Sequence, residues 1–142
     1  MKALTKPAIL DSLREINQYV ITAAQEAHLN KKVAYKLRLA VDEIATNIVQ
    51  HGQIADRHAT IKLMMEIDDE QLTIILEDTG RAYIPHHTDT RPNIHQPLEE
   101  RDIGGLGLFI AHSSVDELHY ERIENYNRHT FVVNRSEVMV SQ

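Results

Sequence analysis

The sequence has no cysteine and no long apolar run among its 142 residues. A chain without cysteine has no disulfide framework, no thiolate metal ligand and no cysteine nucleophile. No stretch approaches the ~20 apolar residues that a transmembrane helix needs. Residues 1–7 also carry too little apolar length for a signal peptide. We therefore expect a cytoplasmic protein that makes no contact with a membrane.

Basic residues are also in short supply, because 15 lysines and arginines face 21 aspartates and glutamates, for a formal net charge of -6. A nucleic-acid-binding surface needs lysine and arginine to neutralise phosphates, so we expect no direct contact with nucleic acid. The 42% apolar and 25% charged residues are ordinary for a globular protein. A chain of this length is most simply one domain, covering residues 1–142.

Apolar residues at helical spacing predict two helices early in the chain, over about residues 8–27 and 32–50. Gly52 is the expected stop of the second helix. A glycine-rich turn that begins at Gly104 is expected to run into a third helix, which ends near Ser114. These helices would each bury one apolar face against a common core.

Strict alternation of apolar and polar residues predicts antiparallel hairpins in two later parts of the chain. The expected strands cover residues 59–67, 72–76, 115–121 and 129–134, after a very short one near residues 2–4. Helices and strands in separate runs favour an α+β fold. We expect a two-layer sandwich with the helices packed on one face of a mixed, mostly antiparallel sheet.

Residues 81–103 form a long segment with little periodicity, and they hold Pro85, Pro92 and Pro97 of the four prolines. A loop of this length inside a compact domain is usually either functional or disordered. Its histidines are irregularly spaced and come without cysteine, so they do not predict a zinc site.

The first candidate for chemistry is a pair of polar residues on the second helix. Glu43 and Asn47 are four residues apart, so their side chains leave the helix on one side, one turn apart. A carboxylate can take a proton, and an amide oxygen can hold a hard cation. The pair alone is equally compatible with an ordinary solvated helix face.

The second candidate is the Asp78-Thr79-Gly80 turn at the end of an apolar strand. A buried aspartate there needs a polar partner. Its carboxylate can accept the amino group of a purine, with Gly80 allowing the ring to approach. The alternative is an ordinary turn aspartate.

The third candidate is the run from Gly104 to Leu108 at the start of the third helix. Free amides at a helix N-terminus form an anion site suited to phosphates. The alternative is a turn that needs glycine for positive φ angles. The P-loop and the dinucleotide-binding glycine pattern are both absent.

Taken in order, these three motifs resemble the GHKL, or Bergerat-fold, superfamily of ATPases, which includes histidine kinases and gyrases. The resemblance covers nearly the whole chain. It departs from the superfamily pattern at Ala82, which stands where a second glycine of the Asp-x-Gly-x-Gly motif is usual. The motifs of that superfamily are matched by Glu43, Asn47, Asp78, Gly80, Gly105 and Gly107.

The resemblance implies a cofactor set of ATP and Mg²⁺. It implies that Asn47 coordinates Mg²⁺, that Asp78 takes the adenine amino group and that Glu43 orients or deprotonates an attacking hydroxyl. Residues 81–103 would be the ATP lid. Further nucleotide contacts are implied for Gly80, Arg101, Gly104, Gly105, Leu106, Gly107, Leu108 and Thr130.

Within the superfamily the chain most resembles the small anti-sigma-factor serine/threonine kinases of bacteria. That likeness implies a kinase that phosphorylates an anti-anti-sigma (STAS-type) protein, sequesters a sigma factor and forms a homodimer. Two alternatives stay open. One is a non-catalytic module in which ATP only sets which partner is held, and the other is a detached ATPase domain of a sensor histidine kinase.

Overall fold

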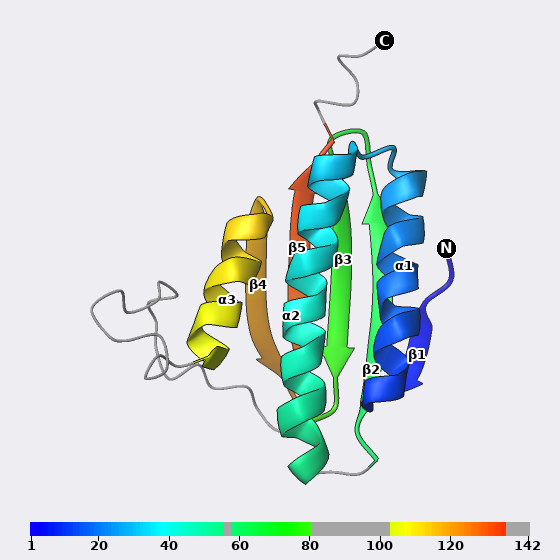
Figure 1. Cartoon of the computed structure of the whole chain (residues 1–142). Helices are drawn as coiled ribbons and strands as arrows, with labels where there is room; N and C mark the ends of the chain where they lie inside the picture. Colours follow the sequence, from blue (N-terminus) through cyan, green and yellow to red (C-terminus); the bar gives the residue numbers. More distant parts are fainter. Residues whose placement is uncertain (56–57, 81–102, 136–142) are drawn as a thin grey trace, which may run out of the picture.

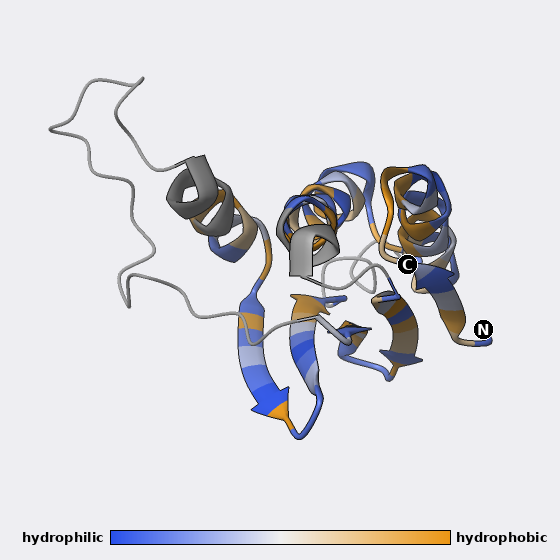
Figure 2. Cartoon of the chain, turned by 90° about the horizontal axis from the view of Figure 1, so that it is seen from below, coloured by the Kyte–Doolittle hydropathy of each residue, from blue (hydrophilic) through white to orange (hydrophobic). Residues whose placement is uncertain are grey.

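The computed structural model describes residues 1–55, 58–80 and 103–135. Three α-helices form one layer and five strands the other, with all three helices on the same face of the sheet (Figures 1 and 2). The predicted α+β two-layer sandwich is therefore confirmed. The elements are β1 (Leu4–Pro7), a 3-10 turn η1 (Leu10–Ser12), α1 (Leu13–Glu26), α2 (Lys31–Ala55), β2 (Thr60–Ile67), β3 (Gln71–Asp78), α3 (Ile103–Ser114), β4 (Glu117–Ile123) and β5 (Tyr126–Asn134).

The strands are ordered β1-β2-β3-β5-β4 in the sheet. Every neighbouring pair among the described strands is antiparallel, so the parallel pairing that a mixed sheet would contain is not present in this part of the chain. The insertion of β5 between β3 and β4 matters for function. It brings the start of β5 beside the end of β3, although these segments are far apart in sequence.

The junction between α1 and α2 follows local chemistry. His28 adopts a left-handed backbone conformation with φ of 56°, which ends α1. Asn30 then caps α2, because its side-chain oxygen accepts the backbone N–H of Val33 at 2.8 Å. The predicted stop of this helix at Gly52 is wrong, since α2 continues to Ala55. One glycine costs a helix only about 1 kcal/mol relative to alanine, which packing over the preceding turns can offset.

The second hairpin also differs from its predicted bounds. The expected strands at residues 115–121 and 129–134 leave Tyr126 and Asn127 in the connection between them, but both belong to β5, and the turn consists of Glu124 and Asn125. Glu124 has a φ of 50°, as tight hairpin turns require. As a result Asn127 joins the ladder and lies opposite Asp78 of β3.

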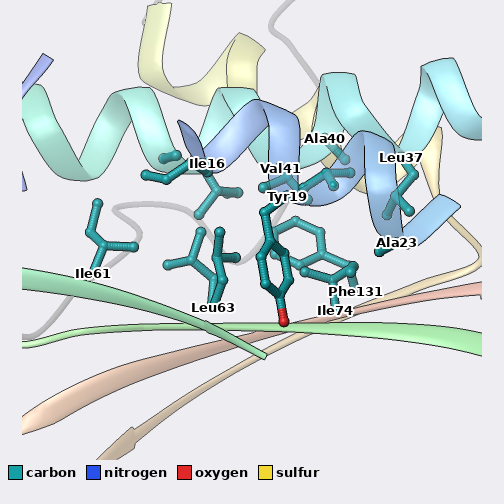
Figure 3. Close-up of a cluster of buried hydrophobic side chains, with 14 of the residues drawn as sticks. Ile16, Tyr19, Ala23, Leu37, Ala40, Val41, Ile61, Leu63, Ile74 and Phe131 are labelled. Atoms are coloured by element: carbon teal, nitrogen blue, oxygen red, sulfur yellow. The ribbon is translucent and has the colours of Figure 1, made fainter. Parts of the chain in front are cut away.

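The core lies between the two layers and is filled by aliphatic side chains, with Phe131 of β5 near its centre (Figure 3). The inward residues of β3 and β5 alternate with outward ones, which is the period-two pattern of strands with one buried face. At the end of this row the inward residues become polar. Asp78, Asn127 and His129 are all buried. No helix in the described ranges is long and apolar enough to cross a membrane.

Tyr19 of α1 is an exception within this apolar core. Its ring points toward the sheet (Figure 3), it is 7% exposed, and its hydroxyl has no hydrogen-bond partner among the described residues. A buried hydroxyl without a partner costs free energy. We expect Tyr19→Phe to raise the free energy of unfolding by about 1 kcal/mol, measured by urea denaturation. Tyr35→Phe, at a site that is 58% exposed, is the control and should change nothing. A lower stability of Tyr19→Phe would show that the hydroxyl is satisfied.

Candidate functional site

The three sequence motifs meet at one end of the molecule. The C-terminal half of α2, the C-terminal end of β3 and the N-terminal end of α3 all lie at the lower end in Figure 1. This follows from topology, because α2 and β3 both run toward that end and α3 starts there. The helix pair α2 and α3 also pack against each other, and α2 contacts β5. The sequence predicted the motifs, and the tertiary fold brings them to one end.

Glu43 and Asn47 lie one turn apart on α2, and both are half-buried. Burial raises the pKa of the Glu43 carboxyl, and the negative charge of neighbouring Asp42 raises it further. Burial raises the pKa of Asp42 as well, although the positive charge of Arg38 lowers it in part. A carboxyl whose pKa is raised is a better proton acceptor than an ordinary glutamate once it is ionised.

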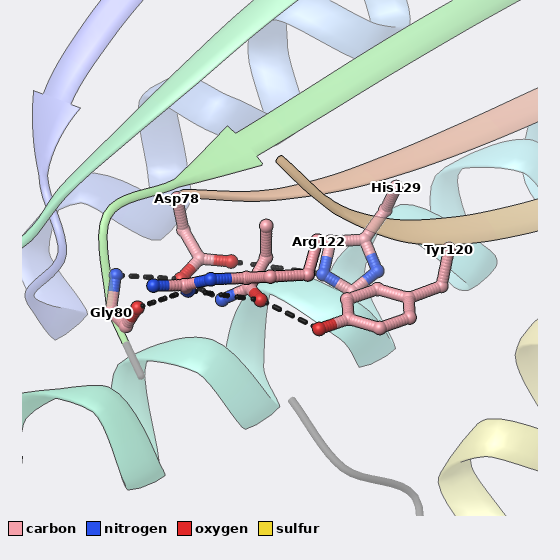
Figure 4. A network of polar contacts seen from close by, with 6 residues as sticks. Asp78, Gly80, Tyr120, Arg122 and His129 are labelled. Atoms are coloured by element: carbon pink, nitrogen blue, oxygen red, sulfur yellow. Dashed lines mark hydrogen bonds and ion pairs between the residues drawn. The ribbon is translucent and has the colours of Figure 1, made fainter. Parts of the chain in front are cut away.

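Asp78 is the last residue of β3 and is 3% exposed. Its Oδ1 accepts two hydrogen bonds, from the backbone N–H of Gly80 at 3.0 Å and from Nδ2 of Asn127 at 3.0 Å (Figure 4). Its Oδ2 is buried and accepts no hydrogen bond from any described residue. His129 Nε2 lies 3.7 Å from Oδ2, beyond hydrogen-bond distance. The structure therefore leaves one buried carboxylate oxygen ready for an external donor.

A polar network continues from Asp78 into β4 and β5. Oδ1 of Asn127 accepts the hydroxyl of Tyr120 at 2.7 Å and Nη1 of Arg122 at 3.3 Å. The same Nη1 donates to the carbonyl oxygen of Gly80 at 2.8 Å. The Tyr120 ring lies against the imidazole of His129, with ring centroids 5.2 Å apart. These contacts join three strands and the turn after β3 into one unit.

Sequence reasoning missed this network, although a signal was available. Asn127 and His129 occupy inward positions of β5, in step with Phe131 and Val133. Polar residues on the inward period of a strand are costly unless paired. They mark a polar end of the core. Because the expected strand begins at residue 129, Asn127 falls outside it and the inward polar pattern is not recognised from the sequence.

The strand register decides on which face of the sheet Thr130 lies. It pairs with Ile75 of β3 and with His119 of β4, one residue out of step with the inward row. Successive strand residues face opposite sides, so Thr130 lies on the sheet face opposite to Asp78. A nucleotide contact from Thr130 stays a prediction, and its position on this face does not favour that contact. The nearest inward residue of β5 is His129.

The glycine-rich run is part of α3 itself, which starts at Ile103. No glycine in the described ranges has a positive φ, so the explanation by a positive-φ turn does not apply to them. The first four N–H groups of a helix have no intrahelical partner. Those groups include the amides of Gly104, Gly105 and Leu106, whereas Gly107 and Leu108 fall in the next turn. Residues 81–102, including Ala82 and Arg101, lie outside the described residues.

Comparisons with known proteins agree with this arrangement. A family model for the histidine kinase-like ATPase domain matches residues 6–133. The serine-protein kinase RsbW of Bacillus licheniformis is 29% identical over 85 residues, which are 58% of this chain and 53% of that protein. RsbW of Bacillus subtilis is 25% identical over 111 residues, which are 70% of this chain and 62% of that protein. The chain thus matches between about half and two thirds of the length of these two relatives.

Among solved structures, the RsbU and RsbW domains of a Mycobacterium tuberculosis protein superpose with a TM-score of 0.61 at 14% identity. That match covers 94% of this chain and 32% of the other. At this identity it supports the fold alone. The family match, by contrast, includes both Glu43 with Asn47 and the Asp78 turn, and it extends through the glycine-rich start of α3. The chain belongs to the histidine kinase-like ATPase domain family.

Proposed function

We propose that this chain is an ATP-dependent serine/threonine protein kinase and anti-sigma factor that phosphorylates a STAS-type anti-anti-sigma protein on a serine. The observation that carries the nucleotide-binding part is the buried Oδ2 of Asp78, which accepts no hydrogen bond from a described residue. The serine-kinase part is supported by the relatives that carry that name. Residues 1–142 act as one such domain in this proposal, with residues 81–103 as its ATP lid.

The described residues fit an adenine nucleotide. The oxygen Oδ2 of Asp78 is an acceptor without a donor, and the exocyclic amino group of adenine is a donor. The amides in the first turn of α3 suit phosphate oxygens, because a helix N-terminus carries unpaired N–H groups and partial positive charge. We assign phosphate contacts to the amides of Gly104, Gly105 and Leu106, and we keep Gly107, Leu108, Gly80 and Arg101 as further nucleotide contacts.

Asn47 is the proposed Mg²⁺ ligand. Its amide oxygen is a hard donor of the kind that Mg²⁺ takes, usually together with waters and substrate phosphates. Mg²⁺, when bound, supplies positive charge to offset the charge of the phosphates. Asn47 is on the same face of α2 as Glu43, one turn nearer to the end where the α3 amides lie. This placement puts the proposed base and the proposed metal ligand on the same face of one rigid element.

Glu43 is the proposed base. Its carboxylate would take the proton of the attacking serine hydroxyl, and a positioned base of this kind typically contributes about 10²- to 10⁴-fold in rate. The half-buried position suits the task, because burial raises the pKa of this carboxyl and makes its ionised form a stronger acceptor. Positioning and charge neutralisation supply the rest of the effect in phosphoryl transfer.

The partner set in this proposal comprises a STAS-type substrate, a sigma factor and a second copy of the chain. The acidic balance of the chain argues against direct DNA contact. Regulation of transcription would therefore act through the proteins that it binds. In this scheme the chain holds either the sigma factor or the STAS protein, and phosphorylation releases the latter.

The proposal is tested by incubating the chain with γ-labelled Mg·ATP and a panel of purified STAS-domain proteins from the same organism. We expect label on one STAS protein, stable to acid as phosphoserine is, and absent when its acceptor serine is replaced by alanine. Acid-labile label on a histidine would support the histidine-kinase alternative instead. Tight Mg·ATP binding with no transfer to any STAS protein would support the non-catalytic module.

A further inference from the structure

We propose that Asn127 is a positioning residue that fixes the carboxylate of Asp78 so that Oδ2 alone is offered to the purine. This inference rests on the proposed function, because it deepens the role given there to Asp78. It adds a determinant of base specificity on β5 that lies outside the three sequence motifs. The supporting geometry is the network in Figure 4.

A carboxylate at the end of a strand is not oriented by its own backbone. Its terminal torsion is broad, so the plane of the carboxylate can rotate unless donors hold it. Both donors in this structure select Oδ1: the N–H of Gly80 and Nδ2 of Asn127, each at 3.0 Å. The Gly80 contact is local, whereas the Asn127 contact comes from another strand and anchors the group to the sheet.

Asn127 can serve as this anchor because its own amide is held in one orientation. Its Oδ1 faces two donors, the Tyr120 hydroxyl at 2.7 Å and Nη1 of Arg122 at 3.3 Å. A flipped amide would turn an NH₂ group toward the Arg122 guanidinium, which only donates, and an oxygen toward the Asp78 carboxylate, which only accepts. Both changes are unfavourable in a site where Asn127 is 1% exposed. The network therefore favours the orientation in which the Asn127 amide presents Nδ2 to Asp78.

Arg122 connects this anchor to the turn after β3. Its Nη1 contacts the Asn127 oxygen and donates to the Gly80 carbonyl at 2.8 Å. Gly80 is the residue whose N–H is the second donor to Asp78. The two donors that select Oδ1 are thus held to each other by one guanidinium. Their geometry is set before any nucleotide binds.

The consequence is a preference among purines. An ionised carboxylate oxygen only accepts hydrogen bonds, so Oδ2 favours the 6-amino group of adenine and opposes a 6-oxo group. A site that keeps a buried polar group for one partner rejects an analogue lacking the matching donor. If the carboxylate of Asp78 were free to rotate, part of this selectivity would be lost, because an acceptor oxygen would face position 6 of the purine only some of the time.

The test compares binding of Mg·ATP and Mg·ITP by calorimetry, since these nucleotides differ only at position 6, amino against oxo, and at the adjoining N1, which carries a hydrogen in ITP alone. We expect the unmodified chain to prefer ATP by at least about tenfold. Asn127→Ala should reduce this preference severalfold, mainly through weaker ATP binding. Tyr120→Phe should reduce it less, because Arg122 still holds the amide. Asn125→Ala, at an exposed turn position of the same hairpin, is the matched control and should keep the full preference.

Urea denaturation of each variant accompanies the binding measurements. If Asn127→Ala does not fold, Tyr120→Phe decides the outcome, because it keeps the ring and removes only the hydroxyl. An unchanged ATP-to-ITP ratio in the folded variants, or an equal weakening of both nucleotides, would overturn the positioning role while leaving the role of Asp78 intact. A wild-type chain that binds neither nucleotide, or both equally, would instead overturn the proposed adenine contact itself.

Discussion

Glu43→Gln is expected to lower the rate of phosphoryl transfer to the STAS partner by about 10²- to 10⁴-fold, the contribution of a well-placed base. Binding of Mg·ATP should be largely unchanged, because glutamine keeps the size and polarity of the side chain and Asn47 remains on the same helix face. Rates come from single-turnover transfer of labelled phosphate, and binding from calorimetry. Transfer at the full wild-type rate would contradict the assignment of Glu43 as base.

The pH dependence of transfer provides a second test of the same residue. Only ionised Glu43 can accept a proton, so the rate should fall as the pH drops through the pKa of this carboxyl. Because burial and the charge of Asp42 raise that pKa, the fall should begin at a higher pH than for an ordinary glutamate. Asp42→Asn is the matched control, since it should retain transfer and move this fall to lower pH. If Asp42→Asn and wild type show the same pH dependence of the transfer rate, Glu43 is excluded as the titrating group.

Stability measurements separate a catalytic loss from a folding defect. Because the pKa of Glu43 is higher in the folded state than in the unfolded state, protonated Glu43 favours folding at a pH below its unfolded-state pKa. This contribution to stability is lost as the pH rises through its folded-state pKa. At neutral pH the ionised Glu43 therefore disfavours the folded state, and an amide at this position removes that effect. We expect Glu43→Gln to unfold at the same or a higher urea concentration than wild type. Catalytic sites commonly trade stability for activity in this way.

Asp78→Asn is expected to weaken Mg·ATP binding by about 30- to 100-fold, equivalent to ~2–3 kcal/mol for a lost hydrogen bond to a charged group. Asparagine can keep an oxygen toward Gly80 and Asn127, so the NH₂ group would occupy the place of Oδ2. A donor there faces the donor of adenine, and the contact becomes repulsive. Calorimetry or displacement of a fluorescent ATP analogue measures the loss.

Asp68→Asn is the matched control for this substitution. Asp68 is an exposed aspartate at the opposite end of the same hairpin, where its Oδ1 accepts the N–H groups of Glu70 at 2.8 Å and Gln71 at 2.7 Å. Asparagine supports the same turn, so this variant should bind ATP as wild type does. Equal ATP affinity in Asp78→Asn and wild type would remove Asp78 from the nucleotide site.

Most of the fold could be read from periodicity. The alternation of buried and partly exposed residues in β3 and the apolar stripe of α2 each specify an element and the face that it buries. The errors lie at element ends, where local signals are weak. Gly52 is a helix-stop signal, yet α2 continues past it. Asn127 is a typical turn residue that pairs with β3 and β4 as part of a strand, and Tyr126 pairs with Ile123 of β4.

The candidate site was predictable only in part. Glu43, Asn47 and Asp78 belong to short motifs whose order along the chain is informative, so sequence alone could propose them. The contact of Asp78 with Asn127 could not be proposed in this way, because Asn127 lies on a strand 49 residues later in the chain. The sheet face of Thr130 could not be read from the sequence either, since a shift of one residue in a strand reverses its face.

The two-layer α+β class, the three motifs and the chemistry of their carboxylate, amide and helix-end N–H groups could all be predicted from the sequence. These properties depend on residue type and local spacing. Only the tertiary structure decided which oxygen of Asp78 is occupied and which is left for a ligand, because the insertion of β5 between β3 and β4 sets that contact. Strand order is fixed by packing of the whole core, and no local pattern in the chain records it.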